Sequence, residues 1–126
     1  WMGKYGDKIE MILSNNDAML LGAIESAKSE GYFGGGKKMG AIGINALPEI
    51  LPAIKDGTII GSILSDAYSE GLNIYTMAYN VATGEDVYKD ITIKPDEMKA
   101  IRVPYIPISK ENVNIAEEMY SKALKK

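Results

Sequence analysis

The sequence predicts an α/β fold with a mainly parallel sheet, and two observations support this prediction. Short apolar runs alternate with helical patterns over residues 9–83, which is the element order of βαβ units. Predicted strands also end in small polar side chains, at Asn16, Asn45 and Ser65. Ligands of open α/β sheets bind outside the carboxyl ends of the strands. We therefore expect these side chains to contribute to a site for a small, hydroxyl-rich ligand.

The first strand is predicted over residues 9–14, after a stretch that resembles the end of a helix, residues 1–7. A helix is predicted from Ala18 to about Ser29, because Asn16 or Asp17 is suited to cap its start. The glycine-rich segment 32–38 has Lys38 where a phosphate-binding loop needs Ser or Thr, and it follows a helix rather than a strand. We interpret it as a surface connection.

The remaining elements follow from periodicity and from the positions of proline and glycine. Pro52 is expected either to kink its helix or to lie close to its start. Pro104 and Pro107 predict an extended linker rather than a central strand over residues 101–108. Further strands are predicted at 39–44, 59–64 and 87–93, and further helices at about 48–55, 67–81 and 112–124.

Composition excludes several classes of function. The 126 residues contain no cysteine and no histidine, so disulfides, Cys or His zinc sites and histidine triads are excluded. A net charge of −3 without a basic stripe argues against a nucleic-acid partner. No apolar run approaches the length of a membrane span, and no leader pattern is present. We do not expect an enzyme, because a hydrolase with paired carboxylates needs other polar side chains around them, and the sequence supplies none.

Several motifs, in register over about residues 8–110, resemble the galactose/glucose-binding proteins of bacterial ABC transporters. They are Lys8-Ile9-Glu10, Asn15-Asn16-Asp17-Ala18-Met19, Gly43-Ile44-Asn45-Ala46-Leu47-Pro48-Glu49, Gly57-Thr58-Ile59-Ile60-Gly61-Ser62-Ile63-Leu64-Ser65-Asp66-Ala67 and Arg102-Val103-Pro104-Tyr105.

The resemblance implies the carboxyl-terminal part of a type I periplasmic binding protein, with a three-layer αβα arrangement and two lobes that close on a monosaccharide. It implies that residues 1–64 belong to the second lobe and 65–93 to the first. Residues 94–104 would cross between the lobes, and 105–126 would return to the second. The partner would be a membrane permease, and the location would be extracytoplasmic, in the periplasm or as a surface lipoprotein. We expect any signal segment to lie outside this chain.

The resemblance also assigns site residues. Asn16 matches an asparagine that binds sugar hydroxyls in the family. Asn45 stands where the family has a sugar-binding aspartate, and Ser65 stands where it has an asparagine. An amide offers one acceptor and one donor group where a carboxylate only accepts, so a sugar other than galactose or glucose, or a polyol, fits about as well.

Glu10 matches the last ligand of the family's calcium site. The other calcium ligands of the family lie outside the matched segments, and calcium needs six to eight oxygens. We expect Glu10 to be at most a residual ligand, with no cofactor required and calcium relevant only to a longer protein.

Structural interpretations stand beside these functional ones. Asn16 and Ser65 are each suited to cap a helix, and Asp17 and Asp66 to stabilise helix N-termini through the macrodipole. Two alternatives to the importer remain: the effector domain of a sugar-responsive transcription regulator, and an isolated fragment without binding activity. In an isolated fragment, Met77, Ala78 and Val81 would face water, so we expect self-association or docking of this helix back on the sheet to cover them.

Overall fold

The computed structural model describes residues 1–34 and 36–124. The chain divides into two compact units: one comprises residues 1–64 with the chain from Ile106 onward, and the other comprises Ser65–Tyr105. The assignment of such segments to separate lobes of a longer protein stays a prediction.

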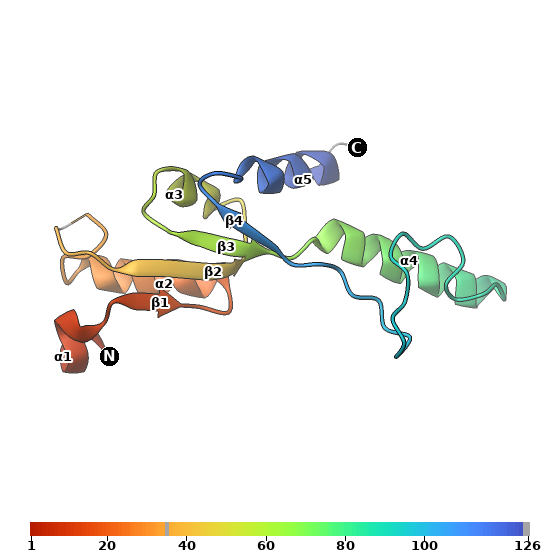
Figure 1. Ribbon diagram of the computed structural model, residues 1–126, viewed down its shortest axis with the longest axis horizontal. Coiled ribbons are helices and arrows are strands. Elements are labelled where there is room, and N and C mark those ends of the chain that lie inside the picture. Colours follow the sequence, from red (N-terminus) through yellow and green to blue (C-terminus); the bar gives the residue numbers. More distant parts are fainter. Residues whose placement is uncertain (35, 125–126) are drawn as a thin grey trace. The chain divides into compact units, whose positions relative to one another are not determined.

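The first unit is built on a sheet in which the strands lie in the order β1-β2-β3-β4 (Figure 1). β1 and β3 both run parallel to β2, whereas β4 runs antiparallel to β3. The sheet is therefore mainly parallel, and the predicted α/β class is confirmed. The strands are β1 (Met11–Leu13), β2 (Gly40–Asn45), β3 (Gly61–Leu64) and β4 (Ile106–Ser109).

Three helices of this unit form the core with one face of the sheet. Leu20 and Ile24 of α2 are buried in one cluster with Ile54 of α3 and Ala116 of α5. The periodicity predicted these helices to within a few residues, and Pro52 lies at the start of α3, where proline is tolerated. The helices of the unit are α1 (Met2–Tyr5), the short 3-10 helix η1 (Gly6–Lys8), α2 (Asp17–Lys28), α3 (Leu51–Lys55) and α5 (Asn114–Leu124).

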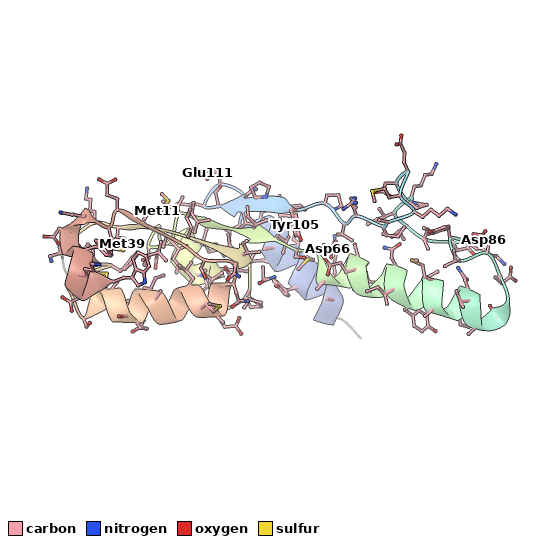
Figure 2. The ribbon with its side chains drawn as sticks, turned by 90° about the horizontal axis from the view of Figure 1, so that it is seen from below. Met11, Met39, Asp66, Asp86, Tyr105 and Glu111 are labelled. Atoms are coloured by element: carbon pink, nitrogen blue, oxygen red, sulfur yellow. The ribbon has the colours of Figure 1, made fainter. Side chains whose placement is uncertain are left out.

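Within the described residues of this unit, no helix lies on the opposite face of the sheet. Side chains alternate between the two faces of a strand, and Met11 and Leu13, on this second face, are 47% and 72% exposed. Figure 2 shows Met11 on the side of the sheet away from α2. The described residues thus supply the sheet and one of the two helical layers of an αβα arrangement.

The second unit consists of α4 (Ala67–Thr83) and a return segment without regular structure. The helix ends as predicted at Gly84, which adopts the left-handed conformation with φ 74°. Two buried asparagines of α4 hold the return segment. Asn73 bonds with the backbone and side chain of Thr92, and Asn80 Nδ2 donates to the carbonyl oxygens of Val87 and Lys89.

Two sequence predictions are wrong in this region. Residues 87–93 do not form a strand, because their backbone groups bond to α4 asparagine side chains instead of to a neighbouring strand. The linker predicted at 101–108 ends earlier, because Ile106–Ser109 pairs with β3. Pro107 is tolerated there because β4 lies at the edge of the sheet formed by the described residues, next to β3.

Candidate ligand-binding site

Asn16 links β1 to α2 and is fixed by the helix that it begins. Its backbone is extended, and its side-chain Oδ1 accepts hydrogen bonds from the backbone N–H groups of Ala18 and Met19 at 2.9 and 3.2 Å. The Ser14 hydroxyl donates to the Asn16 carbonyl oxygen at 2.9 Å. The predicted capping role of Asn16 is thus confirmed, and its side chain has one defined orientation.

Asn45 ends β2 and meets Asn16. The Asn16 Nδ2 donates to the Asn45 Oδ1 at 3.1 Å, although the two residues are 29 apart in the sequence. Both side chains are half-buried. Two of the three predicted site residues therefore form one polar pair at the carboxyl ends of neighbouring parallel strands, as the topological rule requires.

The chain turns sharply after β2, and this turn sets the position of Asn45. Asn45 and the next residue, Ala46, adopt φ values of 104° and 49°, which side-chain-bearing residues rarely do. Such conformations persist where surrounding contacts hold them. Here the Ala46 N–H donates to the Ser62 hydroxyl oxygen at 3.0 Å, and the Leu47 N–H donates to Asp17 Oδ2 at 2.8 Å.

Asp17 and Ser62 form the buried support of this turn. Asp17 is 0% and Ser62 is 1% exposed, and the Ser62 hydroxyl donates to Asp17 Oδ1 at 2.8 Å. Burial raises the pKa of the Asp17 carboxyl, while the hydrogen bonds from the Leu47 N–H and the Ser62 hydroxyl oppose that rise. Asp17 does begin α2, but its carboxylate also holds the β2–α3 turn, and the sequence prediction did not include Ser62.

Gly43 provides the space that the Asp17 carboxylate occupies. A Cβ at position 43 would lie 2.0 Å from Asp17 Oδ1 and 3.2 Å from a methyl carbon of Leu20. Real Cβ atoms do not approach an oxygen so closely. A glycine in a central strand is the sequence signal that could have indicated a close approach here.

Ser65 lies in the second unit, one residue after Leu64, which pairs with Asn45 across the sheet. Its hydroxyl donates to Glu70 Oε1 at 2.8 Å. The cap of α4 is Asp66, which accepts hydrogen bonds from the Ser69 N–H and hydroxyl at 3.1 and 2.6 Å. Ser65 is therefore not the cap of this helix, and its role as a ligand contact stays a prediction.

Glu10 precedes β1 and is exposed. Within residues 1–34 and 36–124, no three acidic or metal-binding side chains come together as a cation site. The neighbouring Asp7 pairs with Lys37 at 3.0 Å instead. The side chains present around Glu10 therefore do not by themselves fit calcium, which takes six to eight oxygens.

A family model described as a periplasmic binding protein domain matches residues 1–86. The chain is similar to the D-galactose/methyl-galactoside binding periplasmic protein of Haemophilus influenzae, with 34% identity over 105 residues, or 83% of this chain and 30% of that protein. It is also 29% identical over 119 residues to the xylitol-binding protein of Mycolicibacterium smegmatis, covering 94% of this chain and 30% of that protein.

The chain is also similar to a solved structure of a solute binding protein. An ABC transporter solute binding protein from Bacillus halodurans, with bound myo-inositol, superposes with a TM-score of 0.69 and 28% identity over 89% of this chain and 34% of that one. The chain spans about a third of the length of these relatives. None of the helices among the described residues combines the length and hydropathy of a membrane-spanning segment.

Proposed function

Because this chain belongs to the periplasmic binding protein domain family, we propose that it is part of the sugar-binding component of a bacterial ABC importer. The family consists of binding proteins, and the relatives named above bind galactose or a methyl-galactoside, xylitol and myo-inositol. All of these ligands are small and rich in hydroxyl groups. The ligand class proposed for this chain is therefore a monosaccharide, such as galactose or glucose, or a polyol.

The hydrogen bond between Asn16 and Asn45 is the observation that carries this proposal. It joins two amide side chains at the end of two parallel strands, where both remain partly accessible. Amide groups donate and accept, which matches the hydroxyl groups of a sugar. We assign Asn16 and Asn45 to ligand binding on this basis, and Ser65 on its place directly after β3.

The importer also implies a location and a partner. We propose an extracytoplasmic location and a membrane permease that receives the sugar from the closed, loaded protein. The Haemophilus influenzae relative is a periplasmic protein and the Bacillus halodurans one is an ABC transporter solute binding protein, and this favours the importer over the effector domain of a transcription regulator. We propose no catalytic role.

Calorimetry on the protein that carries this chain, with a panel of aldoses and polyols, tests the proposal. Asn45→Ala removes an amide from the pair, and a lost hydrogen bond of about 1.4 kcal/mol corresponds to a tenfold weaker affinity. Asn15→Ala is the matched control, because Asn15 is the exposed neighbour of Asn16. No binding by the unmodified protein, or equal affinity in both variants, would contradict the assignment.

The isolated chain is expected to behave differently. It supplies only part of the contacts that a sugar needs, so we expect no affinity tighter than millimolar. Exposed apolar side chains on α4, including Ile74 and Val81 at 69% and 65%, favour self-association. Of the side chains predicted to cause it, Ala78 and Val81 are exposed and Met77 is half-buried. A clean monomer in sedimentation, with this helix still exposed rather than docked back on the sheet, would contradict this expectation.

Calcium is a separate proposal. We propose that, in a longer protein that binds calcium, Glu10 supplies one carboxylate and other parts of that protein supply the remaining oxygens. Glu10→Gln should then reduce the calcium-dependent rise in melting temperature, measured against a chelator control.

A further inference from the structure

The capping bonds of Asn16 fix which way its amide points. Both the Ala18 and Met19 N–H groups donate to the same atom, at 2.9 and 3.2 Å. Only the amide oxygen can accept them, so this atom must be Oδ1. The Nδ2 of Asn16 must then lie on the other side of the amide, toward Asn45. The helix start thus settles an orientation that the shape of an asparagine side chain leaves open.

The orientation of the Asn16 amide also determines the orientation of the Asn45 amide. Asn16 Nδ2 is a donor, so the atom of Asn45 that faces it at 3.1 Å must be the acceptor Oδ1. The Nδ2 of Asn45 is therefore directed away from Asn16. Within the described residues it donates no hydrogen bond, and the half-buried side chain keeps it accessible to a ligand.

The backbone below Asn45 holds this arrangement. Two buried side chains, Asp17 and Ser62, accept the N–H groups of the residues that follow Asn45. The Tyr120 hydroxyl approaches the Asn45 carbonyl oxygen at 3.5 Å. The turn fixes where the Asn45 side chain starts, and the bond to Asn16 fixes its amide, because a reversed amide would place one N–H donor against another and lose that bond.

The pair therefore offers more donors than acceptors to a ligand. The oxygen of Asn16 already accepts two hydrogen bonds and the oxygen of Asn45 accepts one. One N–H of Asn16 and both N–H groups of Asn45 remain for a ligand, against a single lone pair on Asn45 Oδ1. A hydroxyl facing these groups can accept, but its own proton then needs another acceptor. A carboxylate only accepts, and its hydrogen bonds are charge-assisted.

We propose that Asn45 determines specificity by presenting N–H donors, and that the site prefers a sugar acid, with its carboxylate facing Asn45, to the corresponding neutral sugar. This inference rests on the proposed sugar-binding function and names the ligand class of the same site.

Matched ligand pairs and an isosteric variant test the inference. Galactose with galacturonate and glucose with glucuronate are titrated calorimetrically into the protein that carries this chain. We expect each acid to bind about tenfold tighter than its neutral partner, because charge-assisted bonds exceed neutral ones by about 1.4 kcal/mol. Asn45→Asp replaces the donor amide with an acceptor of the same shape, and it should reverse the order. Asn15→Asp places the same charge on the adjacent exposed residue and should leave the order unchanged.

The outcomes separate the two proposals. Tighter binding of the neutral sugars by the unmodified protein, or an order unchanged in Asn45→Asp, would overturn the inference and leave the sugar-binding function intact. Binding of none of the four ligands or of the wider aldose and polyol panel would overturn the proposed function itself. Reversal in both the Asn45 and the Asn15 variants would show a general charge effect and would also overturn the inference.

Discussion

The Ser62 hydroxyl donates a 2.8 Å hydrogen bond to the Asp17 carboxylate across 45 residues of sequence, and both side chains are almost fully buried. Together they accept the N–H groups of Ala46 and Leu47. A buried acid is costly unless its oxygens are hydrogen-bonded, and here they are. The turn that presents Asn45 thus depends on a contact between the start of α2 and the middle of β3.

Removing the Asp17 carboxylate should therefore destabilise the fold. Asp17→Ala leaves the Leu47 N–H and the Ser62 hydroxyl without their acceptor, which costs about 1–3 kcal/mol for each buried unsatisfied group. Urea unfolding measures the change. Glu25→Ala is the control, because Glu25 lies on the same helix and forms an exposed ion pair with Lys28. Its effect should stay within about 0.5 kcal/mol. Equal losses in both variants would refute the prediction.

Two glycine substitutions should have opposite effects. Gly43→Ala places a Cβ 2.0 Å from Asp17 Oδ1, so the carboxylate must move and the folded state should lose about 1–3 kcal/mol. Gly22→Ala meets nothing within 4 Å in the interior of α2 and should gain up to about 1 kcal/mol. Chemical denaturation of the two variants gives the comparison. A stabilised Gly43→Ala would show that the space beside Asp17 is not needed.

The two roles of Asn16 should be separable. Asn16→Ser keeps an oxygen that can cap α2, so the free energy of unfolding should change by less than about 0.5 kcal/mol. It removes the Nδ2 that bonds Asn45, so the side-chain amide resonances of Asn45 should shift and the sugar affinity of the complete protein should fall. Asn16→Ala should lose about 1 kcal/mol as well, because the cap is gone. Unchanged Asn45 resonances in Asn16→Ser would contradict the hydrogen bond.

The return segment of the second unit should respond to acid. The backbone N–H of Ala100, the Arg102 guanidinium and the N–H of Met98 hold the pKa of Asp96 below its ordinary value. A depressed carboxyl pKa stabilises the folded state above about pH 3.9, and this contribution disappears as the pH falls through the folded pKa.

The amide resonances of Met98 and Ala100 should therefore titrate below pH 3.9. Arg102→Gln removes the cation that lies 2.7 Å from Asp96 and should move this titration to higher pH. An unchanged midpoint would show that Arg102 does not affect Asp96.

Much of this structure could be predicted from the sequence because the determining interactions are local. Apolar periodicity marked the strands and helices, and Asn16 and Gly84 marked helix ends by capping chemistry. The meeting of Asn16 and Asn45 follows from the parallel order of their strands.

The remaining features depend on long-range contacts. The Asp17–Ser62 bond joins residues 45 apart, and a serine inside a strand gives no sign of its partner. Alternation at 87–93 suggested a strand, but buried amides on α4 bind that backbone instead. Strand β4 forms because its backbone pairs with β3. The local sequence around Pro107 argues against a strand and contains no information about this pairing.

The two asparagines of the pair should differ in how freely they can be replaced. Asn16 uses its oxygen to start α2, so most replacements there alter folding and recognition together. Among the residues that the structure describes, the Asn45 side chain caps no helix and makes one hydrogen bond, to Asn16. Homologues that bind different sugars should therefore differ at position 45 while retaining a helix-capping residue at position 16.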